Sequence, residues 1–146
     1  MNSKSLLLMT ACLLIPFAMG CGDGKLRPKG YLVKDGGRYV PNEGRLIQVT
    51  FVPIPKDGEP VRDHYYADVD QTTGTFIPAG KDGRGMPAGK YRVAVQIINK
   101  RSDELKGKFD QEKSPFVFDV DSSSNEFVLD LDKPPQFEKQ NANGKS

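Results

Sequence analysis

Apolar and polar residues alternate with a period of two along most of this chain. In residues 46–54 (LIQVTFVPI), the apolar Ile47, Val49 and Phe51 alternate with the polar Gln48 and Thr50. Successive side chains of a β-strand point to opposite faces, so this spacing predicts a strand with one buried and one solvated face. Segments of this kind occur at residues 31–33, 46–54, 64–70, 75–77, 90–99, 116–121 and 127–132.

The connections between these segments carry residues that form tight turns. They include Asp35-Gly36, Asp57-Gly58, Thr73-Gly74 and Asp82-Gly83. Such pairs favour reversals between strands. Apolar residues at helical spacing are missing, and only residues 103–106 suit a helical turn or a loop. We therefore expect an all-β protein, an antiparallel β-sandwich of about seven strands. Its core should contain Phe51, Val95, Phe118 and Leu129, with Gln48, Asp119 and Asp130 at the surface.

The N-terminus has the composition of an export signal. Lys4 precedes a short apolar run at residues 6–17, and small residues then lead to Cys21. A run of this length is typical of a signal peptide and is too short for a stable membrane-spanning helix. We therefore expect a signal peptide at residues 1–20, a Gly- and Lys-rich tether at 21–29 and a folded domain at 30–132. The polar residues 133–146 are expected to be a disordered C-terminal tail.

The two cysteines suggest how the exported chain is held. Cleavage would remove Cys12 and leave Cys21 as a single cysteine at the new N-terminus. Exported proteins usually pair their cysteines in disulfides, so a single one needs another role. Ala18-Met19-Gly20-Cys21 resembles the lipobox of bacterial lipoproteins, and this resemblance implies lipidation of Cys21. An ordinary secretory peptide followed by an unpaired cysteine is the alternative.

Two further motifs resemble those of a known family of domains. Residues 70–76 (DQTTGTF) are similar to its D-x-x-G-x-F element, and Pro87, Gly89, Tyr91 and Val93 match its P-x-G-x-Y-x-V element. These elements are typical of transthyretin-like, or carboxypeptidase-regulatory-like, domains, and the chain is most similar to small planctomycete lipoproteins that carry one. The resemblance implies a prealbumin-like, Ig-like sandwich that serves as an accessory module without catalytic activity.

The same family also includes a ureide hydrolase, which makes an enzyme conceivable. That activity depends on several histidines and on a particular C-terminal tetrapeptide. This sequence has one histidine, His64, and ends in Asn143-Gly144-Lys145-Ser146. We therefore predict no catalytic residues, no cofactor and no metal site, with His64 at the surface, and we rank a hydrolase below a structural or binding module.

Aspartates and tyrosines offer two possible modes of binding. Three predicted strands end in Asp-x-Asp, at residues 68–70, 119–121 and 130–132. Carboxylate oxygens gathered at one end of the fold would suit Ca²⁺, whereas aspartates spaced by two residues are also typical of a solvated strand face. Tyr39, Tyr65 and Tyr66 would suit stacking on sugar rings.

Charge gives one more candidate site and excludes one class of partner. The formal net charge is +2, without the basic stripe that nucleic-acid binding needs. The Gly-rich segment GKDGRG holds Lys81, Asp82 and Arg84, which we predict as a binding loop, because loops on a rigid sandwich commonly carry binding residues.

Together these features predict a lipid-anchored protein of the cell envelope. Its sandwich would be a structural or binding module, with a calcium- or carbohydrate-binding adhesion module as the alternative. The expected partners are the membrane, through the lipid on Cys21, and an envelope protein or a glycan. Gly22 rather than Asp follows Cys21, which favours the outer over the inner membrane, with the domain in the periplasm or at the cell surface.

Overall fold

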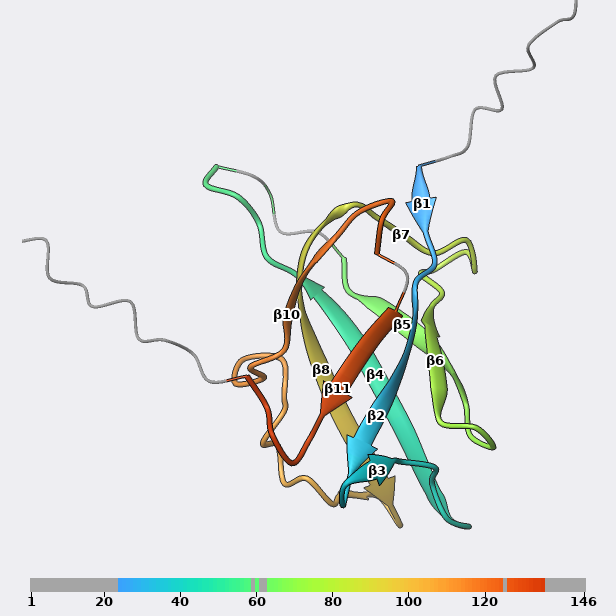
Figure 1. Cartoon of the computed structure of the whole chain (residues 1–146). Helices are drawn as coiled ribbons and strands as arrows, with labels where there is room; N and C mark the ends of the chain where they lie inside the picture. Colours follow the sequence, from blue (N-terminus) through green and yellow to red (C-terminus); the bar gives the residue numbers. More distant parts are fainter. Residues whose placement is uncertain (1–23, 59, 61–62, 125, 136–146) are drawn as a thin grey trace, which may run out of the picture.

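The computed structural model describes residues 24–58, 60, 63–124 and 126–135. All regular elements within these residues are β-strands (Figure 1), which confirms the all-β prediction for this part of the chain. The predicted signal peptide, Cys21 and the tail after Pro135 lie outside the described residues. The strands are β1 (Lys25–Leu26), β2 (Lys29–Lys34), β3 (Gly37–Arg38), β4 (Arg45–Pro53), β5 (Tyr65–Asp70), β6 (Thr75–Pro78), β7 (Met86–Pro87), β8 (Gly89–Asn99), β9 (Ser102–Asp103), β10 (Val117–Val120) and β11 (Glu126–Asp130).

One curled sheet contains most of these strands. Its order is β10-β8-β4-β5-β6-β2-β11, with β3 beside β2 and β9 beside β8, while β1 and β7 form a separate pair. Most neighbours are antiparallel, as predicted, but β11 runs parallel to β2. Parallel neighbours need a long crossover connection, and the chain from β3 to β10 provides one.

The curled sheet opens between β4 and β5. These strands pair only at Thr50 with Tyr66 and at Phe51 with Tyr65, and then diverge. The Gln71 side chain bridges part of the opening: its Oε1 accepts from the Ile47 N–H at 3.0 Å, and its Nε2 donates to the Ile47 carbonyl at 3.3 Å. The bend turns two halves of one sheet toward each other, and a sandwich of about seven strands stays a prediction.

The core lies between these two halves. The inward residues predicted for β4 are confirmed, since Ile47, Val49 and Phe51 are all buried. The prediction is also confirmed for Val95 and Leu129, whereas Phe118 is only half-buried. Phe118 lies on an edge strand, where it packs against Phe127 with ring centroids 4.7 Å apart. Edge strands have a neighbour on one side only, which leaves part of the ring in contact with water.

The folded part begins earlier than the sequence predicts. Lys25 and Leu26, expected in the tether, form β1 and pair with Pro87 and Met86 of β7. Leu26 packs against the core, and Pro28 is buried. Apolar contact therefore holds a segment whose Gly- and Lys-rich composition had suggested a free linker.

Of residues 103–106, Asp103 ends β9 and residues 104–106 form a turn and not a helix. Asp103 organises this turn: its Oδ1 accepts from the Ile97 and Leu105 N–H groups at 3.1 and 3.0 Å, and its Oδ2 accepts from the Gly107 N–H at 2.9 Å. A carboxylate that accepts several backbone N–H groups favours such a turn over a helix.

The inward face of β4 gives a direct stability prediction. Phe51 is 0% exposed, so Phe51→Ala should lower the free energy of unfolding by about 3–5 kcal/mol through lost contacts and a residual cavity. Gln48→Ala on the outward face of the same strand should cost about 0.5 kcal/mol or less. Urea unfolding monitored by circular dichroism measures both. A larger loss for Gln48→Ala would mean that the two faces are assigned the wrong way round.

Candidate functional site

The predicted binding loop lies between β6 and β7, where ion pairs engage its charges. Lys81 Nζ lies 2.7 Å from Asp63 Oδ2, and Asp82 Oδ2 lies 2.5 Å from Lys25 Nζ and 3.0 Å from Arg84 Nε. The hydrogen bond from Lys25 is the main cause that lowers the pKa of Asp82 to about 2. The structure thus brings Lys81, Asp82 and Arg84 together, with Asp82 fastening β1 to the loop.

The strand-end aspartates do not gather at one end of the fold. β10 pairs with the beginning of β8, and β4 begins opposite the end of β8. Asp119 and Asp121 therefore lie at one end, while Asp70 and Asp130 lie at the other, where β5 and β11 finish. The calcium hypothesis requires three strand ends at one end of the fold, and the structure does not meet this requirement. Among the described residues no three or more His, Cys, Asp and Glu side chains are grouped as metal ligands.

These aspartates instead hold the turns that follow their strands. Asp70 Oδ1 accepts from the Thr72 N–H at 2.8 Å and from its hydroxyl at 2.6 Å, and Oδ2 accepts from the Thr73 hydroxyl at 2.9 Å. These hydrogen bonds, that from the Thr72 hydroxyl first, lower the pKa of Asp70 to about 2. Asp121 accepts from Ser123 in the same way, which lowers its pKa too. Side chains of this type commonly stabilise turns in this manner.

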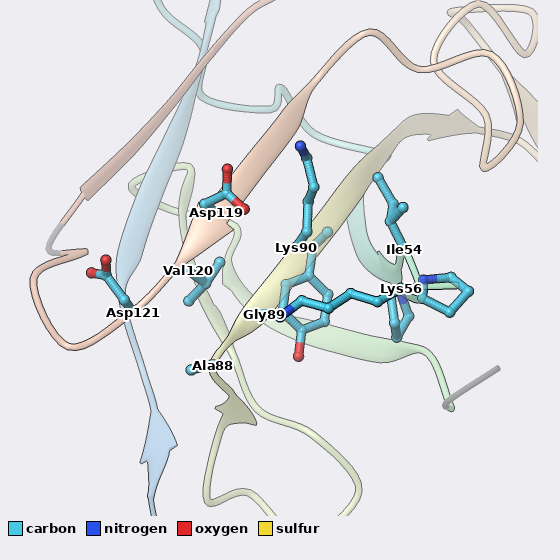
Figure 2. Close-up of a pocket in the computed structure, with 11 residues that line it drawn as sticks. Ile54, Lys56, Ala88, Gly89, Lys90, Asp119, Val120 and Asp121 are labelled. Carbon is cyan, nitrogen blue, oxygen red and sulfur yellow. The ribbon is translucent and has the colours of Figure 1, made fainter. Parts of the chain in front are cut away.

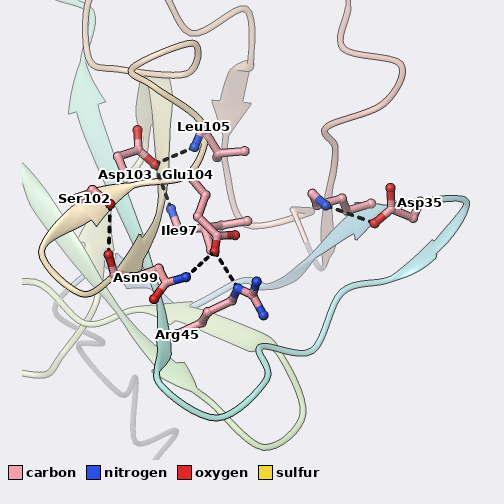
Figure 3. Close-up of polar contacts among 9 residues, drawn as sticks. Asp35, Arg45, Ile97, Asn99, Ser102, Asp103, Glu104 and Leu105 are labelled. Atoms are coloured by element: carbon pink, nitrogen blue, oxygen red, sulfur yellow. Dashed lines mark hydrogen bonds and ion pairs between the residues drawn. The ribbon is translucent and has the colours of Figure 1, made fainter.

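A polar cluster closes the end at which β4 begins and β8 finishes (Figure 3). Glu104 Oε1 accepts from Arg45 Nε at 2.6 Å and from Asn99 Nδ2 at 2.8 Å. The Arg45 hydrogen bond is the main cause that lowers the pKa of Glu104. The ionised Glu104 carboxylate therefore joins the start of β4 to the end of β8. A carboxyl group with a lowered pKa is also a poor proton donor near neutral pH.

His64, the single histidine of the sequence, lies directly before β5 and is half-buried rather than fully at the surface. The three tyrosines weighed for sugar binding also differ in position. Tyr65 points inward and packs edge-on against Tyr91, with ring centroids 5.9 Å apart, and Tyr39 is half-buried. Tyr66 is 63% exposed on the outward face of β5. Of these tyrosines, only Tyr66 offers an open aromatic surface.

One groove lies where β4 ends, β8 begins and β10 ends (Figure 2). It has a volume of about 580 Å³ and an apolar wall that includes Pro53, Ile54 and Pro55. Lys90 and Asp119 are opposite each other on paired strands at its rim. The groove therefore combines an apolar wall with charges of both signs.

A second hollow crosses the outward faces of β4 and β8, and the predictions from sequence did not include it. We call it the amide groove. It consists of two adjoining hollows, of about 400 and 520 Å³, which share Gln48, Thr50, Gln96 and Gln111 in their linings. One part continues to Ala94, Asp110 and Glu112, and the other to Tyr66, Asp68 and Gln71. The sequence indicates that Gln48 and Gln96 both occupy outward positions of alternating segments. It does not indicate the strand register that places them opposite each other.

Comparisons with protein-family models, with curated proteins and with solved structures find no match to this chain. The described residues contain no helix of the length and hydropathy needed to cross a membrane. The fold and the site define this protein as an all-β domain with grooves on its surface.

The attachment of β1 should depend on Asp82 and on pH. We expect Asp82→Asn to speed amide hydrogen exchange in β1 and β7, because it removes the negative charge that pairs with Lys25. The pKa of Asp82 is lowered from 3.8 to about 2 in the folded protein, so this stabilisation is present above about pH 4 and disappears as the pH falls through about 2. The ratio of exchange rates between variant and wild type should therefore approach one at the acidic end.

Asp63→Asn is the matched control for this experiment. It removes the negative charge that pairs with Lys81 of the same loop and leaves Lys25 and Asp82 unchanged. Exchange in β1 should be nearly unchanged in this variant. If both variants accelerated hydrogen exchange in β1 equally, the overall charge around the loop, and not the Lys25–Asp82 contact, would hold β1 in place.

Proposed function

We propose that this protein is a lipid-anchored, non-catalytic binding module of a bacterial cell envelope. Its curled sheet would act as the two-layer, transthyretin-like sandwich that the sequence motifs suggest. Lys4, the apolar run at residues 6–17 and the lipobox-like Ala18-Met19-Gly20-Cys21 support export and lipidation. The outer membrane is the favoured location because Gly22, rather than Asp, follows Cys21.

The position of β1 is the observation that carries the proposal. β1 begins at Lys25, only four residues after Cys21, and it is fastened to β7 and to Asp82. Four extended residues span at most about 14 Å. A lipid on Cys21 would therefore hold the domain close to the bilayer, with the end that contains β1 and β7 nearest the membrane. The end closed by Arg45 and Glu104 would face away from it.

The use of the acidic groups supports a binding role over catalysis. Catalytic acids and bases work best with pKa values near the operating pH. Hydrogen bonds and ion pairs instead lower the pKa values of Asp70, Asp82, Glu104 and Asp121, so these groups stay ionised. Each is engaged in a turn or an ion pair, which leaves the grooves as the surfaces suited to function.

Lipidation can be tested on the full chain expressed in a bacterium and labelled with a fatty-acid analogue. Cys21→Ser should carry at least about tenfold less label than wild type, because the acylated thiol is gone, and it should accumulate as an uncleaved or a soluble form. Cys12→Ser is the matched control and should keep the label, since residue 12 lies within the segment removed by cleavage. Equal labelling of Cys21→Ser and wild type would refute the anchor.

A further inference from the structure

The amide groove has a floor whose geometry is set by strand register. Gln48 of β4 lies directly opposite Gln96 of β8, and Thr50 lies opposite Ala94. Side chains opposite each other on paired strands have Cβ atoms about 4.5–5.5 Å apart. The two amides are therefore neighbours on one face of the sheet.

The 104–116 loop forms one wall of the groove, and it is anchored in the core. Phe109 and Phe116 are buried and pack with ring centroids 5.4 Å apart. The Val95 N–H donates to the Phe109 carbonyl at 2.9 Å, and the buried Ser114 hydroxyl donates to the Val93 carbonyl at 2.5 Å. This loop also covers Ala94, which is only 5% exposed although it points outward. The wall is therefore part of the fold.

The opposite wall carries an open aromatic ring. Thr50 pairs with Tyr66 on β5, so Ala94, Thr50 and Tyr66 form a row across three strands. Beyond this row β4 and β5 diverge, and the opening between them continues the groove toward Asp68 and Gln71. Tyr66 thus lines a trough whose polar groups are amides, hydroxyls and carboxylates, with the aliphatic side chains of Ile47, Val49, Ala67 and Val69 beside them.

The chemistry of the lining indicates what would bind there. Amides and hydroxyls both donate and accept hydrogen bonds, as sugar hydroxyls do. Among the described residues that line the groove none is Lys or Arg, and the charged ones are the acids Asp68, Asp110 and Glu112. Such a lining disfavours anionic ligands, because like charges repel. An exposed aromatic ring adds a flat apolar surface on which the C–H face of a pyranose packs.

We infer that the amide groove binds a neutral oligosaccharide, with Tyr66 stacking on one sugar ring and Gln48, Gln96 and Gln111 bonding its hydroxyls. This inference rests on the binding role proposed above and gives it a ligand class. With the β1 end toward the membrane, the groove lies on the side of the domain and stays open to an envelope glycan.

Titration calorimetry of the full chain in detergent tests this directly. The probes are cellohexaose, maltohexaose and mannohexaose, with hexagalacturonate as the anionic comparison. At least one neutral hexasaccharide should bind more tightly than hexagalacturonate. Tyr66→Ala should weaken that binding at least about tenfold, while Tyr66→Phe keeps the ring and should stay within about threefold of wild type.

Controls separate the groove from the rest of the surface. Gln96→Ala tests the floor independently of Tyr66 and should also weaken binding, with thermal melts confirming that both variants fold. Val128→Ala removes exposed apolar surface from β11, and Lys90→Ala alters the other groove; neither should change affinity. No binding of any neutral probe, tighter binding of hexagalacturonate, or loss with Lys90→Ala but not Tyr66→Ala would overturn the inference.

Chemical-shift mapping on the labelled full chain supplies a second readout. Sugar-dependent shifts should concentrate on residues that line the amide groove. Shifts that depend on protein concentration and affect this face without sugar would mean that a second copy occupies it, which would also overturn the inference. Because lipid labelling of Cys21 is measured separately, failure of sugar binding and failure of the anchor are distinguishable.

Discussion

Packing around Phe51 is the constraint on which the curled sheet depends. Its ring lies 6.2 Å from Phe76, 6.3 Å from Tyr91 and 5.9 Å from Phe127, measured between centroids. These partners come from β6, β8 and β11, so one side chain of β4 touches both halves of the sheet. Gly30 on β2 shows how tight this region is, because a Cβ there would lie 2.3 Å from the Phe76 ring. Close packing of this kind fixes how far the sheet must bend.

The bend has consequences at the surface. It separates β4 from β5 after two residue pairs, and Gln71 supplies the hydrogen bonds for Ile47 that a strand would otherwise make. The same core holds Phe109 and Phe116, and with them the loop that overhangs Ala94. Core packing therefore holds the backbone of the loop that forms one wall of the amide groove, and strand pairing positions its floor. Preorganisation of this kind reduces the entropic cost of binding.

Local alternation in the sequence was enough to predict the long strands and their buried faces. It fails where burial depends on distant neighbours. Ala94 lies on the outward face of β8 and is nevertheless covered by a loop, whereas Phe118 lies on the inward face of β10 and remains half-exposed at a sheet edge. The pairing of β1 with β7 and the parallel pairing of β11 with β2 join segments far apart in the chain. No period within one segment encodes such pairings.

The candidate sites show the same limit. A run of charges such as Lys81, Asp82 and Arg84 is visible in the sequence, but the ion pairs that Asp82 makes with Lys25 and Arg84 appear only in the folded chain. Conversely, Gln48 and Gln96 look like ordinary solvated positions until register sets them opposite each other. In this fold the resolved pKa shifts of the aspartates arise from hydrogen bonds that hold turns, loops and ends. Charges that hold the structure in this way cannot move without cost, so ligand recognition is better served by neutral amides on a sheet whose position the core already fixes.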